Sequence, residues 1–236
     1  MAYYSELQTL DFALGSYLNG IFSNITVHGP KEFQEFLQRP ANKKIFRHRA
    51  DDTATFIRDF INHEAGKQTS GTPTDTEIRN YLNLPCVNYF RRPGLVVSDE
   101  LIINNIGKSV TFTDDLGTAF SLECVPLTLT YSLRFVAWDD LTLDKMMLAY
   151  VNHVLDIKHG KNRFNCTYRI GSQDVIMPNV IKGVKQTIFD DGSPQGIGRV
   201  VAAETNIEVE ALVAFGGSVD WVEPVEVIGT LGKLIP

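Results

Sequence analysis

The segment 125–155 constrains the fold most strongly, because two hydrophobic periodicities meet inside it. Between Leu127 and Phe135 apolar and polar residues alternate, which predicts a strand with one face in the core and one polar face. After Asp139-Asp140 the apolar residues recur at three-and-four spacing, and the aspartates can cap the free N–H groups of a helix. The segment therefore predicts a strand that leads directly into an amphipathic helix packed on it.

Similar patterns predict the other elements. Helices are expected over 5–22, 30–38, from Asp51-Asp52 through Ile61, and in a short stretch through Ile78 and Tyr81. Strands are expected over 23–28, 86–90, 109–113, 164–170 and 206–215, with LVV and LII, inside 95–103, as buried strands. The segment 175–189 contains Pro178 and Gly183, which indicates an edge strand or a bulged one. The polar segment 66–75 is expected to be a mobile loop.

These elements add up to an α+β fold. We expect one mostly antiparallel sheet, with the helices that begin near Ser5 and Asp140 packed on one face. A length of 236 residues, 44% of them hydrophobic, suffices for one large core. We therefore expect a single domain over 1–236, with an inserted helical and loop region at about 30–84 and an extended C-terminal arm at about 218–236. Apolar residues of the arm that a partner could bury are Trp221, Val225, Val227, Ile228 and Leu231.

The net charge, the cysteines and the N-terminal sequence limit the classes of protein to which this chain could belong. A net charge of −6, from 22 basic and 28 acidic residues, argues against non-specific binding of nucleic acid by the whole protein. The three cysteines are far apart and lack CxxC spacing, so we expect reduced, buried thiols. The N-terminus lacks the basic start and apolar run of a signal peptide, and no stretch approaches the roughly 20 apolar residues of a membrane helix. We expect a protein that stays in the cytosol, or in a particle assembled there, and that does not associate with a membrane.

Patterns that would indicate catalysis or a metal site are weak. His63-Glu64 has no second histidine at the spacing of a zinc-protease helix. The carboxylates of Asp139, Asp140 and Asp144 could bind a hard cation, but capping of a helix explains them as well. Gly196 and Gly198 lack the third glycine of a dinucleotide loop. We predict no enzyme, no cofactor and no metal, with a small enzyme kept as an alternative.

A basic run between residues 39 and 49 is the main charge feature of the chain. It contains no acid, and it consists of Arg39, Lys43, Lys44, Arg47 and Arg49. The run can be a solvated loop, or it can contact DNA phosphates or the acidic C-terminal part of a neighbouring copy. The acidic residues of that part are Glu204, Glu208, Glu210, Asp220, Glu223 and Glu226. We take the run as a candidate interface.

Three stretches together resemble the tail terminator and tail-sheath-stabiliser proteins of contractile-tailed bacteriophages. The first is the opening helix of MAYYSELQTLDFALGSYLNGIFSNITV, which runs into Phe22-Ser23-Asn24-Ile25. The second is the strand that starts at Pro126 and is followed by a helix led by two aspartates. The third is the late strand 206–215, which sits where those proteins carry their closing strand. Residues 30–84 lie outside the resemblance.

The resemblance implies a non-enzymatic virion protein. Such a protein forms a ring, usually of six copies, that caps the tail tube or sheath and joins the tail to the neck beneath the capsid. The implied partners are further copies of the chain, the tail tube or sheath protein and a neck or connector protein, with DNA passing through the ring lumen. The implied location is the tail or neck of a virion assembled in the host cytoplasm. Exposed strand edges and an apolar arm suit the two different faces that a closed ring needs.

Two alternatives stay open at this stage. One is another head-to-tail connector, such as a neck adaptor, or the cap of a bacterial contractile injection system. The other is a small enzyme or a DNA-binding module that uses the basic run.

Overall fold

A computed structural model describes residues 6–25, 28–66, 71, 73–97, 109–113, 119–170, 173–215 and 229–230. The helices are α1 (Glu6–Ser23), α2 (Lys31–Gln38), α3 (Thr53–Ala65), α4 (Asp75–Tyr81) and α5 (Asp140–Val154). Short 3-10 helices are η1 (Ala41–Lys43), η2 (Ile157–His159) and η3 (Val184–Gln186). The strands are β1 (Ile45–Arg47), β2 (Cys86–Arg91), β3 (Val96–Val97), β4 (Ser109–Thr113), β5 (Ala119–Ala137), β6 (Arg163–Ile170), β7 (Gln173–Lys182), β8 (Asp190–Asp191), β9 (Val201–Phe215) and β10 (Gly229–Thr230).

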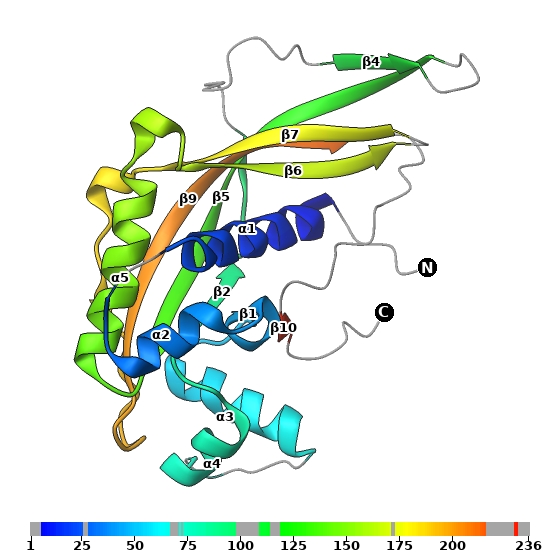
Figure 1. Ribbon diagram of the computed structural model, residues 1–236. Helices are drawn as coiled ribbons and strands as arrows, with labels where there is room; N and C mark the ends of the chain where they lie inside the picture. The colour runs from blue at the N-terminus through cyan, green and yellow to red at the C-terminus, as the bar shows by residue number, and fades with distance from the viewer. Residues whose placement is uncertain are drawn as a thin grey trace.

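The predicted α+β fold is confirmed. One mixed and mostly antiparallel sheet runs in the order β10-β1-β2-β5-β9-β7-β6, with β3 and β4 paired to β5 and β8 paired to β9. The sheet is curled, and α1 and α5 cover one of its faces (Figure 1). Its centre is the long antiparallel pair of β5 and β9, whose register runs from Glu123 opposite Phe215 to Ala137 opposite Val201. β1 pairs in parallel with both β2 and β10.

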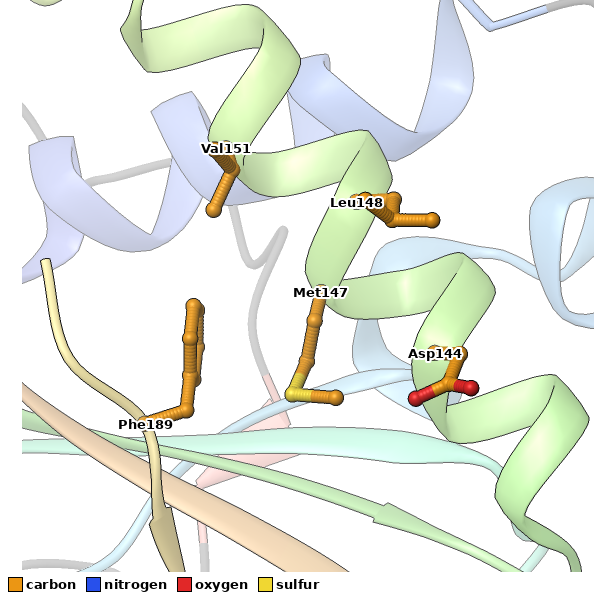
Figure 2. A pocket seen from close by; sticks show the side chains of 5 residues that line it. All are labelled: Asp144, Met147, Leu148, Val151 and Phe189. Atoms are coloured by element: carbon orange, nitrogen blue, oxygen red, sulfur yellow. The ribbon is translucent and has the colours of Figure 1, made fainter.

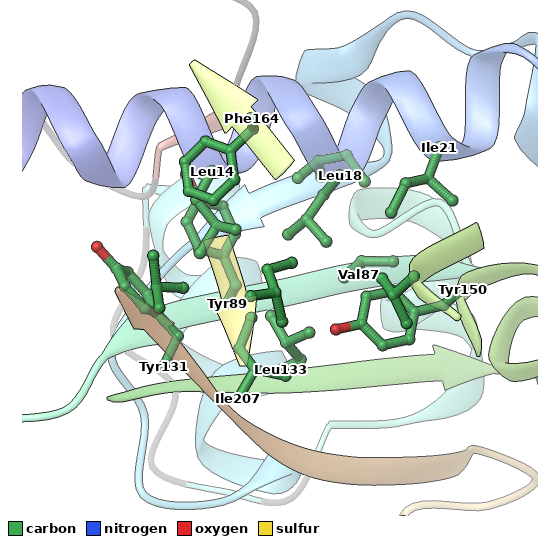
Figure 3. Close-up of a cluster of buried hydrophobic side chains, with 14 of the residues drawn as sticks. Leu14, Leu18, Ile21, Val87, Tyr89, Tyr131, Leu133, Tyr150, Phe164 and Ile207 are labelled. Atoms are coloured by element: carbon green, nitrogen blue, oxygen red, sulfur yellow. The ribbon is translucent and has the colours of Figure 1, made fainter. Parts of the chain in front are cut away.

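The main core lies between the sheet and the two long helices. Leu14 and Leu18 of α1 are fully buried, as are Leu133 of β5 and Tyr150 of α5. Figure 3 shows these side chains gathered between α1 and the strands. The alternation predicted for β5 explains this core, because every second side chain of a strand points to the same face. Burial of such side chains is the main driving force for folding.

A second, smaller core lies on the other face of the sheet, under α3 and α4. Phe56 and Phe60 of α3 and Ile78 of α4 pack there against Phe46 of β1 and Val136 of β5. Val136 directly follows Phe135, which belongs to the main core, so the two clusters use opposite faces of one strand. Residues 30–84, which lie outside the resemblance, thus contribute β1 to the sheet as well as the helices over this second core.

Side-chain caps begin three of the helices, as the sequence predicts for two of them. The Asp139 carboxylate accepts a hydrogen bond from the Thr142 N–H at 2.8 Å and so begins α5. Asp52 accepts from the Thr55 N–H at 2.6 Å and begins α3. A reciprocal capping box between Thr74 and Glu77 begins α4.

In the described residues one predicted strand is wrong, and another is present but is not buried as predicted. Ser23 is the last residue of α1, and the Asn24 amide donates to the Gly20 carbonyl at 3.0 Å, so no strand starts at 23. Residues 26–27 lie outside the described part of the chain. The LVV run contributes the strand β3, but the prediction that this strand is buried is wrong. Val96 and Val97 are 65% and 58% exposed, and among the described strands β3 pairs only with β5. The LII run lies outside the described residues.

The strand β7 corrects another prediction, because it lies between β9 and β6 and is not an edge of the described sheet. Pro178 pairs across from Asn165 of β6, and pairing with β9 begins at the next residue, Asn179. Proline has no N–H to donate, so it is tolerated just before pairing on both sides begins.

Several other expectations concern residues that the structure does not describe. They are half of the residues of the loop 66–75, and the arm 218–236 apart from β10. The predicted organisation as one domain with an insertion and an arm stays a prediction. Among the described helices, none combines the length and apolar character needed to cross a membrane.

Candidate interaction surfaces

The helix α5 is apolar on two sides. Its inner side, with Met146 and Tyr150, is fully buried against the sheet. Its outer side carries Leu141, Leu148 and, just after the helix, Leu155, which are 57%, 54% and 42% exposed. These leucines are spaced by seven residues, close to two helical turns, so they lie on one face. A helix that only borders a sheet needs one apolar side, and the second side therefore indicates a further contact.

A groove accompanies this outer face of α5. It has a volume of about 420 Å³ and is lined by Asp144, Met147, Leu148, Val151 and Phe189. Figure 2 shows Met147 and Val151 extending from α5 on the side where Phe189 lies. The ring of Phe189 is held by Phe135, whose centroid is 5.7 Å away, and the preceding Ile188 is 72% exposed.

The described lining of the groove is mainly apolar, which suits the docking of an apolar surface. Among the described residues that line the groove, Asp144 is the single polar side chain, and the other four are apolar. We call Leu141, Leu148, Leu155, Ile157 and Ile188, with this groove, the α5 surface; all five side chains are at least 42% exposed. Large exposed apolar surfaces on soluble proteins commonly mark interaction sites.

Arg39, the first cation of the basic run, binds main-chain groups of the same chain. Its guanidinium donates to the carbonyls of Asn83, Leu84 and Pro85 at 2.5, 2.9 and 3.0 Å. These three carbonyls precede β2, so Arg39 fixes the entry into that strand.

Lys44 is fully buried. Its ammonium donates to the Ser23 hydroxyl at 3.0 Å and to the Leu37 carbonyl at 3.2 Å, and it lies 5.8 Å from the centroid of the Phe36 ring. Burial, and secondarily the nearby charge of Arg39, lower the pKa of Lys44. This lysine joins the end of α1 to the end of α2 and cannot reach an external partner.

Arg47 pairs with Asp11, a carboxylate of α1 that is 2% exposed. The distance is 3.1 Å, and Arg91 reaches the same carboxylate at 3.0 Å. The Tyr131 hydroxyl donates to Asp11 at 2.7 Å. The basic run does not predict this cluster, although an acid inside the apolar stripe of a predicted helix is a usable signal for it. Of the basic run, only Lys43 and Arg49 are exposed.

Of the acidic residues proposed as partners of the basic run, two are paired with cations of the same chain. Glu204 pairs with the buried Arg134, whose guanidinium also donates to the carbonyls of Ala50 and Asp51 at 2.8 Å each. Glu210 pairs with Lys182 at 2.7 Å. Glu208 is exposed, and Asp220, Glu223 and Glu226 lie outside the described residues.

The arm residues named from the sequence are Trp221, Val225, Val227, Ile228 and Leu231, and all five lie outside the described part of the chain. The described fragment of the arm is β10, which pairs with the outer edge of β1.

The cysteines are free and buried, as predicted. Burial raises the pKa of the Cys166 thiol to about 12, and it raises the pKa of Cys86 and Cys124 as well. A raised pKa disfavours the thiolate, which is the reactive and metal-binding form of cysteine, so these thiols are suited to a packing role in the core. Within the described ranges, no three side chains of histidine, cysteine, aspartate or glutamate gather in a way that could hold a metal ion.

No protein-family model matches this chain, and no curated protein matches it either. The fold, the α5 surface and the resemblance in three stretches are therefore the observations that bear on function.

Proposed function

We propose that this chain is a structural virion protein whose copies form a ring that terminates the tail tube or sheath of a contractile-tailed phage and joins the tail to the neck. The observation that carries the proposal is the outer face of α5, where leucines spaced by seven residues stay exposed on a helix whose other side is already buried. An assembly subunit needs such a face, because its apolar side chains are covered only after assembly.

The placement of the three resembling stretches supports the proposal. They correspond to α1, to β5 followed by α5, and to β9. β5 and β9 pair along their length, and α1 and α5 pack together on one side of that pair (Figure 1). Stretches that are scattered in the sequence thus form one continuous core, as expected if the resemblance reflects a shared fold.

The arrangement also suits a closed ring. A ring requires two different, complementary surfaces on each subunit, so that each copy binds the next in the same way. The α5 surface lies at one side of the molecule, whereas the β1–β10 end of the sheet lies elsewhere (Figure 1). Surfaces of different chemistry on different sides favour head-to-tail contacts over a two-fold dimer.

Leu148→Asp tests the α5 surface. Because Leu148 is 54% exposed, we expect the variant to keep its circular dichroism spectrum and melting temperature while it loses assembly. The mass in solution, measured by light scattering, and binding to purified tail ends, seen by negative-stain microscopy, are the readouts. A matched control is Asn206→Asp, which adds the same charge at an exposed position of β9 and is expected to assemble.

A failure of the α5 surface as a joint and a failure of the ring itself give different results. A Leu148→Asp protein that assembles like the wild type would exclude the α5 surface as a joint. A wild-type protein that stays a single subunit and never binds tails would count against the ring itself.

A further inference from the structure

The segment 92–97 is exposed along its whole length, although its last two residues form the strand β3. Leu95, Val96 and Val97 are 51%, 65% and 58% exposed, and the exposed Arg92 adds a cation close to them in the chain. The Arg92 N–H donates to the Thr130 carbonyl of β5 at 2.8 Å, which fixes the start of the segment on the sheet. We call residues 92–97 the β3 segment. It combines three exposed apolar side chains with one positive charge.

The groove of the α5 surface carries the opposite charge. Asp144, which is exposed, lines the groove and lies on the same helix as Leu148 (Figure 2). Asp190 and Asp191 form β8, directly follow Phe189 of the groove lining, and are also exposed. An apolar groove with carboxylates beside it suits a segment that has apolar side chains and a cation, because burial of apolar area and attraction between opposite charges then favour the same contact. The β3 segment has this composition.

The two surfaces lie apart on one copy. β3 pairs with Leu127 and Thr128 of β5. The groove lies further along β5, because the ring of Phe189, which lines it, is 5.7 Å from the ring of Phe135. Phe135 follows Thr128 by seven positions on β5, which is about 23 Å along an uncurled strand. While β3 stays paired with β5, a β3 segment that docks in the groove therefore belongs to another copy.

We propose that the β3 segment of one copy docks on the α5 surface of the next copy. Its apolar side chains lie against the groove, and the Arg92 guanidinium lies beside the Asp144 carboxylate. The two surfaces differ and are complementary, so the contact repeats head to tail and can close a ring. The inference rests on the proposed ring and names both sides of one of its joints.

The first test exchanges the two charges in the full-length chain. Arg92→Glu and Asp144→Arg each place like charges at the contact, and we expect each to raise the concentration needed for assembly at least tenfold in light scattering. The double variant Arg92→Glu/Asp144→Arg restores opposite charges and is expected to assemble within about threefold of the wild type, which a role in folding alone would not produce. The matched control Arg163→Glu reverses an exposed arginine of β6 and is expected to assemble normally.

The second test asks which surfaces meet. A chain with Val96→Cys is mixed with a chain with Leu148→Cys and oxidised with copper phenanthroline; the native cysteines are buried. We expect disulfide-linked dimers from the mixture and none from either chain alone, because a head-to-tail contact brings position 96 of one copy to position 148 of the next. Ile176→Cys, at a position of β7 that is 60% exposed, replaces Val96→Cys in the control mixture and is expected to give no link.

Failure of this joint and failure of the ring give different results. Rings that form while the mixture gives no link, or a double variant that assembles no better than the single variants, would overturn the joint and leave the ring function standing. Links from Leu148→Cys alone would show a two-fold contact and would also overturn it. A wild type that never assembles would refute the ring function together with the joint.

Discussion

Asp11 is a charged residue in the middle of the main core. It lies on α1 and is bound by Arg47 of β1, Arg91 of β2 and the hydroxyl of Tyr131 of β5. Its main-chain carbonyl accepts from the Tyr89 hydroxyl at 2.9 Å. One acid thus ties the first helix to three strands that follow it by up to 120 positions. A buried ion cluster of this kind specifies how elements dock, and its loss is costly because the remaining charges stay behind.

We expect Asp11→Asn to destabilise the fold by about 2 to 4 kcal/mol. Removing one partner of a buried ion pair typically costs about 3 to 5 kcal/mol, and the partial exposure of both arginines reduces that loss. Urea unfolding of the variant and the wild type gives the difference. Glu208→Gln, at an exposed position of β9, serves as the control and is expected to unfold like the wild type. Equal midpoints for Asp11→Asn and the wild type would show that the cluster does not stabilise the fold.

Lys44 predicts a pH dependence whose sign follows from its lowered pKa. An ordinary lysine has a pKa of 10.5, and burial holds the folded value below it. Between the two pKa values the unfolded chain binds more protons, so raising the pH through this window stabilises the folded state. The stability of the wild type relative to Lys44→Met is therefore expected to rise from about pH 7 to about pH 10. Urea unfolding of both proteins at both pH values measures the difference, and a constant difference would contradict a lowered pKa.

At the scale of elements, α5 joins the core to the outer surface. It begins at the Asp139 cap, packs Met146 and Tyr150 inward, and presents Leu148 outward. The same helix carries both the buried face and the outer leucines. The residue at which the helix begins therefore determines the direction in which the outer leucines point.

Asp139→Ala is expected to lower stability by about 1 kcal/mol, the usual loss for a helix cap. Part of the loss is offset, since burial and the neighbouring Asp139 together raise the pKa of Glu32, and the variant removes that repulsion. The control Asp144→Ala takes a carboxylate from the same helix without removing a cap and is expected to unfold like the wild type. Thermal unfolding compares the two, and an equal loss in both would argue against capping.

The elements that could be predicted are those in which a hydrophobic periodicity continues over many consecutive residues. The alternation from Leu127 to Phe135 and the helical spacing after Asp139 depend only on which face is buried, and both are confirmed. The position of β7 could not be predicted, because Pro178 indicates an edge while the pairing with β9 starts one residue later. The LVV run is equally ambiguous, since three apolar residues do not reveal whether another layer covers them.

The candidate interface was harder to predict than the fold. A run of five cations indicates a charged surface, but Arg39, Lys44 and Arg47 find their partners far along the chain. Burial of a cation depends on tertiary contacts that local composition does not contain. The α5 surface was hidden for a related reason, because a helix pattern with apolar residues on two sides does not reveal which side meets the sheet.

At the scale of the whole molecule, different surfaces lie on different sides of one curled sheet. The α5 surface is apolar, the end of the sheet at β1 and β10 lies beside the exposed Lys43, and β4 with the start of β5 projects away from the helices (Figure 1). The proposed ring requires this arrangement, because each copy must bind a neighbour on two different sides.

Charge should matter for the contact between copies. Lys43→Glu combined with Arg49→Glu reverses the two exposed cations of the basic run, and we expect ring formation to weaken by about tenfold in concentration and to lose salt dependence. Light scattering over a range of protein and salt concentrations measures this. The matched control, Lys158→Glu combined with Lys185→Glu, reverses two other exposed lysines and is expected to assemble normally. Normal assembly of the first variant would remove the basic run from the joint.

The most direct test of the account is the mass and shape of the purified full-length chain, measured by light scattering and negative-stain microscopy. We expect closed rings, usually of six copies, that bind to the ends of purified tails. Single subunits of 26.4 kDa at every concentration, with no binding to tail ends, would contradict it.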